Sequence, residues 1–315
     1  MDEFASVRVF VKVVECGSFA AAGRLLGVSK SVITKRVSEL EERVSAQLLV
    51  RSTRRLALTD AGRSYYERCA RILADLEDAR DQIVARTAGL RGSLRVSCIT
   101  SFTARQLSAD LCQFQLDHRD LTLEVHHNDR VYDPIQENYD LCIQTMDIQG
   151  SAIVRRPLTQ LRRAFFATPD CLRRIGPIGN PAELLGRRVA HNNFISPGNE
   201  VRLRGPEGEV TVPIRPTLLS NSIWMIREAV LRGDCVGILP IYFALDELLS
   251  GALVPILADY KVPSVALNAY FRRSDHLPIK LRTLLDFLIA RYRGEPPWEQ
   301  TLRTHRPDLG RLLIS

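Results

Sequence analysis

The chain has 315 residues, of which 45% are hydrophobic and 25% are charged, and its formal net charge is +7. At roughly 150 residues per domain this length predicts two or three domains, and the composition excludes wholesale disorder and collagen-like fibres. No apolar run reaches the roughly 18 residues of a transmembrane helix, and no signal peptide is visible. The seven cysteines contain no Cys-x-x-Cys pair, which excludes the common zinc and redox motifs. We therefore expect a cytoplasmic protein with reduced thiols and no membrane partner.

The positive charge is concentrated near the N-terminus. Residues 24–55 contain eight basic and three acidic residues, a local excess of five positive charges. A local excess of this kind is a better sign of a polyanionic partner than the total charge is.

The same region predicts three short helices. Residues 4–14 place apolar side chains at three-to-four spacing, and Cys16-Gly17 ends that helix. Ser18 is suited to cap a helix over residues 19–26, with Gly27 as the left-handed residue after it. Ser29 is suited to cap a third helix over residues 30–43.

Two capped helices joined by a tight turn predict a helix-turn-helix, whose second helix enters the major groove of DNA by its N-terminal end. A basic tip between the apolar runs 48–50 and 56–58 predicts a hairpin that grips the backbone or minor groove. The expected DNA contacts are Ser18, Ser29, Lys30, Ser31, Thr34, Lys35, Arg36, Arg51, Arg54 and Arg55. The alternative is an ordinary three-helix unit with a solvated basic face.

Thr59 is suited to cap a long helix that continues to about residue 88, where Gly89 and Gly92 indicate a hinge. Apolar residues at alternating spacings of four and three form a heptad seam, which favours dimerisation through this helix. The seam consists of Tyr65, Cys69, Ile72, Leu76, Ala79 and Ile83. The alternative is burial of this helix against the C-terminal sheet of the same chain.

From Ser93 onward strands and helices alternate, and the βαβαβ order predicts a mostly parallel sheet with helices on its faces. Strands are expected at 94–99, 121–126, 141–143, 163–167, 188–190, 236–239 and 265–271. Helices are expected at 104–116, 134–137, 222–231, 242–249 and 279–292. The tail after Gly294 shows no clear element.

Residues 1–62 resemble the winged helix-turn-helix of the LysR-type transcriptional regulators. The matching residues are Ser18-Phe19, Ala21-Ala22, Val28-Ser29, Val32-Ile33-Thr34-Lys35, Leu40-Glu41, Arg51, Leu58-Thr59 and Ala61-Gly62. Two positions depart from the family pattern: Val44-Ser45 replaces Leu-Gly after the recognition helix, and Leu48-Leu49 replaces Leu-Phe in the wing. The Ser in place of Gly is expected to alter the end of the recognition helix.

The resemblance implies a mainly helical DNA-binding domain (1–62), a linker and dimerisation helix (60–89), an α/β effector-binding domain (93–293) and a tail (294–315). The effector domain would consist of two subdomains similar to periplasmic solute-binding proteins. The first would hold residues 93–162 and 269–293, and the second residues 163–268. The chain would cross between them near 161–167 and 265–271. A homodimer or homotetramer and a contact with RNA polymerase are also implied.

Ligands of open α/β sheets bind beyond the carboxyl ends of strands, near free N–H groups of helix starts. Polar residues at such places, together with family positions that bind inducers, give the expected effector contacts. These are Thr100, Ser101, Phe102, Thr145, His191, Asn192 and Asn221. The alternative for each polar residue is an ordinary cap or turn role. Paired arginines, including Arg162-Arg163, are expected on solvated faces.

No metal cluster, catalytic constellation or phosphate-binding glycine loop is present in the sequence, so we expect neither an enzyme nor a cofactor. The leading hypothesis is a transcriptional regulator that binds double-stranded promoter DNA and responds to a small polar or anionic effector of unknown identity. The alternative is a solute-binding or enzymatic α/β protein with a structural helical extension at its N-terminus.

Overall fold

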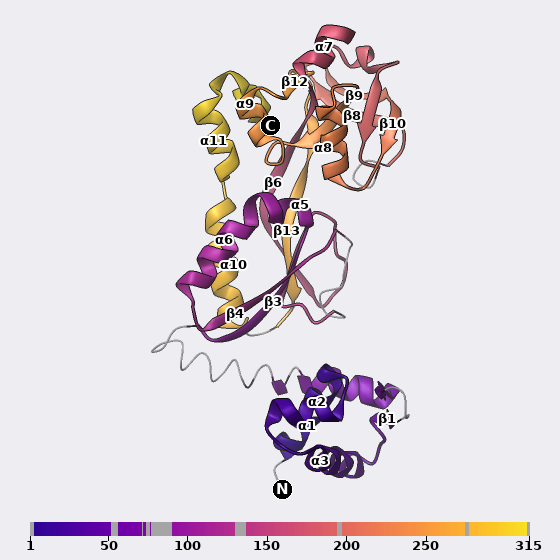
Figure 1. Ribbon diagram of the computed structural model, residues 1–315, viewed down its shortest axis with the longest axis vertical. Coiled ribbons are helices and arrows are strands. Elements are labelled where there is room, and N and C mark those ends of the chain that lie inside the picture. The colour runs from indigo at the N-terminus through magenta and orange to yellow at the C-terminus, as the bar shows by residue number, and fades with distance from the viewer. Residues whose placement is uncertain are drawn as a thin grey trace. The chain divides into compact units, whose positions relative to one another are not determined.

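The computed structural model describes residues 3–51, 56–70, 72–73, 76, 90–129, 137–193, 197–274 and 277–313. The chain divides into two compact units, Met1–Gly89 and Leu90–Ser315. Both are visible in Figure 1, and each is described by itself. No helix among the described residues has the length and apolar character that crossing a membrane requires.

The first unit contains three helices and a small hairpin. The helices are α1 (Glu3–Cys16), α2 (Phe19–Leu26) and α3 (Lys30–Arg43), and the antiparallel strands are β1 (Leu49–Arg51) and β2 (Leu56–Leu58). Residues 60–70 form a further helix. Phe10, Ile33, Val37 and Leu49 are fully buried and form the centre of the core. The three predicted helices before the hairpin and the hairpin itself are therefore confirmed, as is the start of the long helix. Its predicted continuation over residues 77–88 lies outside the described residues.

The second unit is built on one mixed sheet of nine strands. Its path is β10-β7-β11-β6-β13-β5-β3-β4, with β12 paired to β6. The strands are β3 (Gly92–Cys98), β4 (Leu121–His127), β5 (Leu141–Gln144), β6 (Ile153–Ala167), β7 (Arg188–His191), β10 (Arg215–Leu219), β11 (Val236–Pro240), β12 (Val254–Ile256) and β13 (Val262–Arg272). The helices are α5 (Thr100–Phe102), α6 (Ser108–Asp117), α7 (Pro169–Ile175), α8 (Ile223–Leu231), α9 (Leu245–Ser250) and α10 (Ile279–Tyr292). Thr103–Leu107 is a π-helical segment between α5 and α6, and Pro181–Leu184 is a 3-10 helix.

Two long strands join the two halves of this sheet. β6 and β13 are antiparallel neighbours, and they separate β5, β3 and β4 from β11, β7 and β10. β3 is parallel to β4 and β5, and β7 is parallel to β10 and β11. β6 and β13, by contrast, pair antiparallel with β11 and β5. The prediction of a mostly parallel sheet was thus wrong at the centre of the sheet. There β6 and β13 connect the two βαβ halves, and both strands pair antiparallel with their neighbours.

The sequence prediction missed the hairpin of β8 (Glu200–Gly205) and β9 (Gly208–Pro213). Val201, Leu203 and Val212 of this hairpin are buried in the core of the second half of the sheet. The expected helix at 134–137 lies almost wholly outside the described residues.

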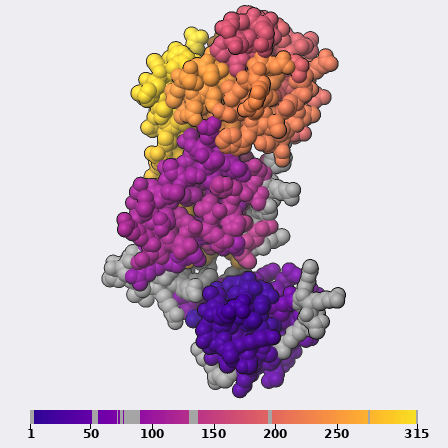
Figure 2. All heavy atoms as spheres, viewed as in Figure 1, coloured from indigo at the N-terminus to yellow at the C-terminus, as the bar shows by residue number. Residues whose placement is uncertain are grey.

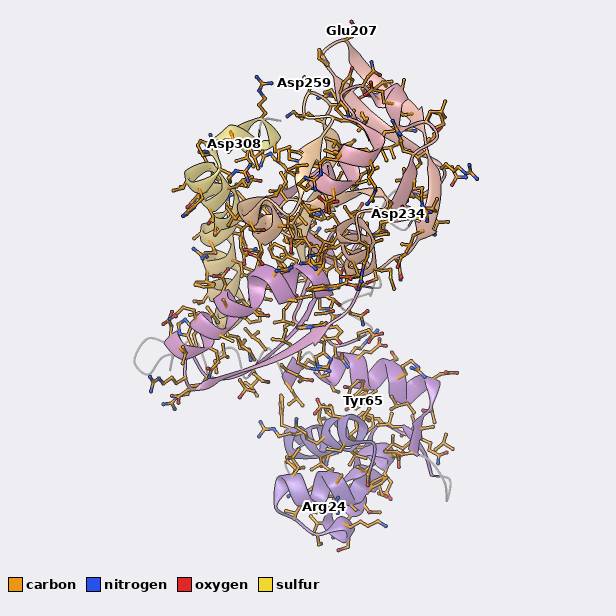
Figure 3. The ribbon with its side chains drawn as sticks, turned by 45° about the horizontal axis from the view of Figure 1, so that its top comes forward. Arg24, Tyr65, Glu207, Asp234, Asp259 and Asp308 are labelled. Carbon is orange, nitrogen blue, oxygen red and sulfur yellow. The ribbon has the colours of Figure 1, made fainter. Side chains whose placement is uncertain are left out.

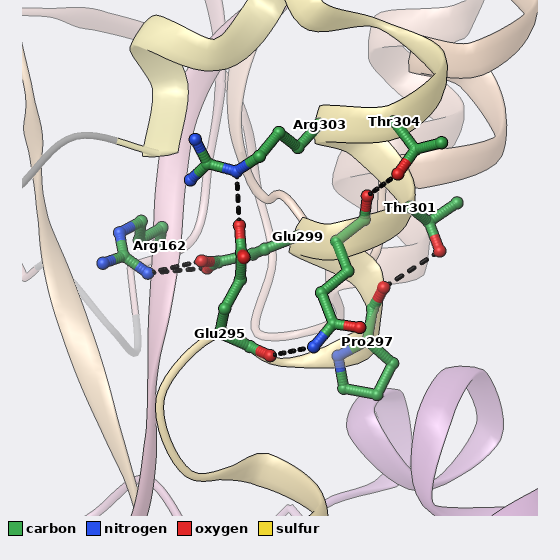
Figure 4. A network of polar contacts seen from close by, with 8 residues as sticks. Arg162, Glu295, Pro297, Glu299, Thr301, Arg303 and Thr304 are labelled. Carbon is green, nitrogen blue, oxygen red and sulfur yellow. Dashed lines mark hydrogen bonds and ion pairs between the residues drawn. The ribbon is translucent and has the colours of Figure 1, made fainter.

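The tail after Gly294, for which the sequence showed no clear element, forms two helical segments. α11 (Pro297–His305) follows α10 closely, and a 3-10 helix continues over Pro307–Leu313. Trp298 is 1% exposed, and Glu299 accepts two hydrogen bonds from Arg162 Nη1, at 2.8 and 2.7 Å. Figure 4 shows this ion pair between α11 and β6. The first turn of α11 is therefore anchored in the core of the unit.

Candidate DNA-binding surface and effector cleft

The turn between α2 and α3 is built from local capping interactions. Ser18 Oγ accepts from Ala21 N, and Ser29 Oγ accepts from Val32 N, both at 3.4 Å. Gly27 has φ +67°, the left-handed conformation that ends α2 at little steric cost. These features confirm the predicted caps, and they fix the direction in which α3 leaves the turn.

Gly23 is a buried glycine inside α2 whose role was not predicted from the sequence. A Cβ atom at Gly23 would lie 2.8 Å from the carbonyl oxygen of Val28. Only glycine lets α2 approach the start of α3 this closely, so Gly23 sets the distance between the two helices. The signal was available in the sequence as a glycine inside a helical pattern.

The N-terminal end of α3 presents polar groups to solvent. Lys30, Ser31 and Lys35 are exposed, and Thr34 is half-buried. Thr34 Oγ1 donates to the carbonyl of Lys30, and Ser31 Oγ lies 2.8 Å from Ser29 Oγ. The opposite face, with Ile33 and Val37, is fully buried. This division leaves ammonium and hydroxyl groups on one surface, as direct readout of base edges and phosphates requires.

The remaining predicted DNA contacts fall in different places. Ser18 is half-buried at the start of α2. Arg36 is half-buried and lines a groove with Phe4, Arg8 and Leu76 rather than standing free in solvent. Arg51 ends strand β1, and Arg54 and Arg55 lie outside the described residues.

A carboxylate joins the hairpin to α3, and a hydroxyl joins it to the following helix. Glu41 Oε1 accepts from the backbone N–H groups of Leu48 and Leu49, at 2.8 and 3.0 Å. Thr59 Oγ1 accepts from Gly62 N at 2.9 Å and so caps the next helix, as predicted. It also donates to the carbonyl of Gln47 at 2.6 Å. The residues of the family-like pattern therefore hold the hairpin and the recognition helix together.

The seam residues of the following helix divide into two groups. The ring of Tyr65, labelled in Figure 3, lies 5.9 Å from the ring of Phe10 in α1. Cys69 is 5% exposed in the same core. Ile72, by contrast, is 52% exposed, and Leu76 lines the groove beside Phe4. Tyr65 and Cys69 thus pack within the unit, while Ala79 and Ile83 lie outside the described residues.

The second unit contains an open cleft, to which the long strands β6 and β13 contribute Leu161, Arg163 and Val265. Figure 2 shows the surfaces that flank this region, magenta for residues near 120–150 and orange for residues near 220–250. Ser101, Thr145, Asn192 and Asn221, all predicted effector contacts, line the cleft. Ser101 Oγ lies 2.9 Å from Tyr242 Oη, so the two halves of the sheet meet at the cleft through a hydrogen bond.

Thr100, Phe102 and His191 do not line this cleft. The backbone N–H of Thr100 donates to Asp129 Oδ1 at 2.8 Å. Phe102 is fully buried, with its ring 5.3 to 5.6 Å from those of Tyr242, Tyr292 and Trp298. His191 is 2% exposed at the end of β7. The prediction of Phe102 as an effector contact was wrong, because a residue at the start of an amphipathic helix can face the core.

The cleft is also lined by Trp224, Tyr242 and Arg163, none of which was predicted from the sequence as an effector contact. Burial raises the pKa of the Tyr242 phenol well above its usual value, so its hydroxyl remains protonated and able to donate. Burial lowers the pKa of Arg163 to about 10, which leaves the guanidinium charged at neutral pH. Arg163 was expected on a solvated face, and the structure corrects this.

Two buried cysteines of the second unit have thiols that resist ionisation. Burial raises the pKa of Cys98 to about 12 and that of Cys235 to about 11, which disfavours the thiolate form. No group of three His, Cys, Asp or Glu residues in the described parts of the chain could hold a metal ion.

A capped helix-turn-helix with a polar recognition surface, linked to an α/β unit with a cleft, defines a ligand-responsive DNA-binding protein. Residues 4–63 match the bacterial regulatory helix-turn-helix proteins of the lysR family, and residues 87–293 match the LysR substrate binding domain. The chain therefore belongs to the LysR family of transcriptional regulators, and it is a regulator rather than an enzyme.

Individual relatives agree with this assignment. An HTH-type transcriptional regulator of Xanthomonas campestris is 33% identical over 90% of this chain and 83% of its own length. The HTH-type transcriptional activator AaeR of Escherichia coli is 29% identical over 91% of this chain and 93% of its own length. The solved structure of CrgA, a LysR-type regulator from Neisseria meningitidis, is 25% identical and superposes with a TM-score of 0.59, covering 92% of this chain and 99% of that one.

Proposed function

We propose that this regulator reads promoter DNA through the N-terminal end of α3, with Lys30, Ser31, Thr34 and Lys35 facing the major groove. The proposal rests on the exposure of Lys30, Ser31 and Lys35, with Thr34 half-buried beside them, on a helix whose start is capped and whose other face is buried. Val32 is 38% exposed on the same stretch, and such an apolar side chain suits the methyl group of thymine. Phosphate contacts from the basic hairpin fix the register without adding base specificity.

We further propose that the active species is a homodimer or homotetramer that binds half-sites about one helical turn apart. The exposed Ile72 and the half-buried Leu76, which lines a groove, support an interface along the helix after β2. Tyr65 and Cys69 would contribute indirectly, by fixing that helix to α1.

A small polar or anionic effector in the cleft of the second unit is proposed to modulate contact with promoter DNA and RNA polymerase. Hydroxyl and amide groups of Ser101, Thr145, Asn192 and Asn221 support a polar ligand. Because a ligand shifts an equilibrium only through its differential affinity, the effector must bind two states of the regulator unequally. Because its proposed target is promoter DNA, we propose that the regulator acts in the cytoplasm.

Titration of the full chain with the DNA upstream of its own gene, at rising salt, tests the proposal. We expect the logarithm of the binding constant to fall linearly with the logarithm of salt concentration, with a clear preference over shuffled DNA of equal length. A flat salt dependence together with equal affinity for shuffled DNA would contradict it.

A further inference from the structure

Arg163 brings a positive charge to the wall of the cleft. Among the described residues that line the cleft, the charged side chains are Arg163 and Asp129. The rest of the lining combines hydroxyl and amide groups with apolar side chains. The charge of a ligand that fits this cleft therefore depends on whether Arg163 and Asp129 already have partners within the protein.

The direction of Arg163 follows from the geometry of β6. Successive side chains of a strand point to opposite faces, so Leu161 and Arg163 share the face that Arg162 does not. Leu161 is paired with Val265, and Arg163 is paired with Pro240, and all four residues line the cleft. Arg162 instead forms its ion pair with Glu299 of α11. One arginine of the pair thus anchors α11, and the next one borders the cleft.

The partners of Arg163 in the described residues are neutral. Its Nε and Nη2 donate to the carbonyl oxygen of Pro263, at 3.0 and 2.6 Å. Burial is the cause of its lowered pKa, and no carboxylate among the described residues contributes to the shift. A partly desolvated guanidinium without a counter-charge is costly, and an anion that forms charge-assisted hydrogen bonds with it removes that cost.

Asp129 is differently placed. It is exposed, and its Oδ1 accepts from the backbone N–H at the start of α5. Its carboxylate is thus solvated and hydrogen-bonded without a ligand. It would repel a second negative charge on the ligand, and this favours a single anionic group.

The apolar part of the lining indicates the body of the ligand. Leu161, Val265, Ile99 and Ile223 contribute aliphatic surface, and the Trp224 indole contributes an aromatic one. Small-molecule sites combine such surface with a few polar groups that fix orientation.

We propose that Arg163 is the charge partner of the effector, and that the effector is an organic monocarboxylate with a small, largely apolar body. This inference rests on the proposed effector cleft, and it names the chemical class that the cleft selects.

Binding of matched probes to the full chain tests it. The probes are benzoate and hexanoate, their neutral amides benzamide and hexanamide, and the dianion hexanedioate. Calorimetry gives affinities, and tryptophan fluorescence localises binding, because Trp224 lines the cleft while the other tryptophan, Trp298, is buried. We expect at least one monocarboxylate to bind at least about tenfold more tightly than its amide and to change the fluorescence. Hexanedioate should bind more weakly than hexanoate.

Variants assign the effect to Arg163. Arg163→Gln should weaken carboxylate binding at least about tenfold and leave amide binding unchanged, whereas Arg163→Lys should retain part of the affinity. Arg202→Gln removes an exposed arginine of β8 and should change neither. Thermal unfolding of each variant verifies that it is folded.

The inference is overturned if no monocarboxylate binds up to roughly 10 mM, if amides bind as well as carboxylates, or if folded Arg163→Gln binds carboxylates normally. DNA binding is measured on the same samples. If the wild-type chain binds specific DNA but no carboxylate, this inference alone is rejected. If the wild-type chain shows no preference for specific DNA over shuffled DNA, the proposed function is rejected.

Discussion

Gly62 lies in the first turn of the helix that follows the hairpin, directly against the backbone of Leu48. A Cβ atom there would be 1.9 Å from the carbonyl oxygen of Leu48. Alanine ordinarily stabilises a helix relative to glycine, but here the methyl group would push the helix away from the hairpin. Gly62→Ala should therefore destabilise the first unit by about 1–3 kcal/mol.

Hydrogen exchange of the α1–α3 amides in the full chain measures this change, because it reports local opening separately from the second unit. Arg63→Ala, at the exposed neighbouring position, serves as the control and should leave the exchange nearly unchanged. Equal protection in Gly62→Ala and wild type would show that the close approach of Gly62 to Leu48 does not affect the stability of the first unit.

Ser45 follows the C-terminal end of α3 and occupies the position where the family pattern has glycine. Its φ is +51°, a left-handed conformation that costs a residue with a Cβ atom about 1 kcal/mol or more. Replacement by glycine should relieve this strain, although glycine also loses more entropy on folding. We expect Ser45→Gly to stabilise the first unit by about 0.5–1 kcal/mol, seen as slower amide exchange in α3. Faster exchange would contradict the strain argument.

At the scale of elements, α11 depends on contacts with distant parts of the chain. Glu299 has a side chain 3% exposed and is paired with Arg162, which is 24% exposed. Removing one member of a buried pair leaves an uncompensated charge, whereas removing both is much less costly. Arg162→Met and Glu299→Met should each destabilise the second unit by about 3 kcal/mol, and the double variant should cost less than the sum.

Urea unfolding followed by the fluorescence of Trp298 measures the cycle, since that residue adjoins Glu299 in α11. Additive effects of the two substitutions would show that the pair contributes no coupling. Thr304→Ala, on the exposed side of α11, controls for changes in the helix itself.

The sequence predicted those parts of the structure that depend on neighbouring residues. Ser18, Gly27 and Ser29 act on groups within a few residues, so the turn and the exposed end of α3 could be recognised. The anchor of α11 could not, because Arg162 and Glu299 are 137 residues apart. The position of Arg163 could not be predicted for the same reason. The sequence of an arginine pair does not show which face of its strand, here β6, will border a cleft.

At the scale of the whole molecule, the two units divide the work of recognition. The local excess of positive charge at residues 24–55 lies in the unit with the helix-turn-helix. The cleft lies in the unit formed by Leu90–Ser315. We propose that α3 reads the DNA sequence and that Lys35, whose side chain is 75% exposed, contacts a base edge.

Selection of binding sites from random DNA by the full chain tests this claim most directly, with wild type, Lys35→Ala and Lys12→Ala compared. Lys12 is a lysine of α1 that is ion-paired with Glu15, so it controls for loss of charge. We predict that Lys35→Ala loses about 1–3 kcal/mol of discrimination at one position of each half-site, and that Lys12→Ala keeps the wild-type profile. Identical profiles for Lys35→Ala and wild type would contradict the claim.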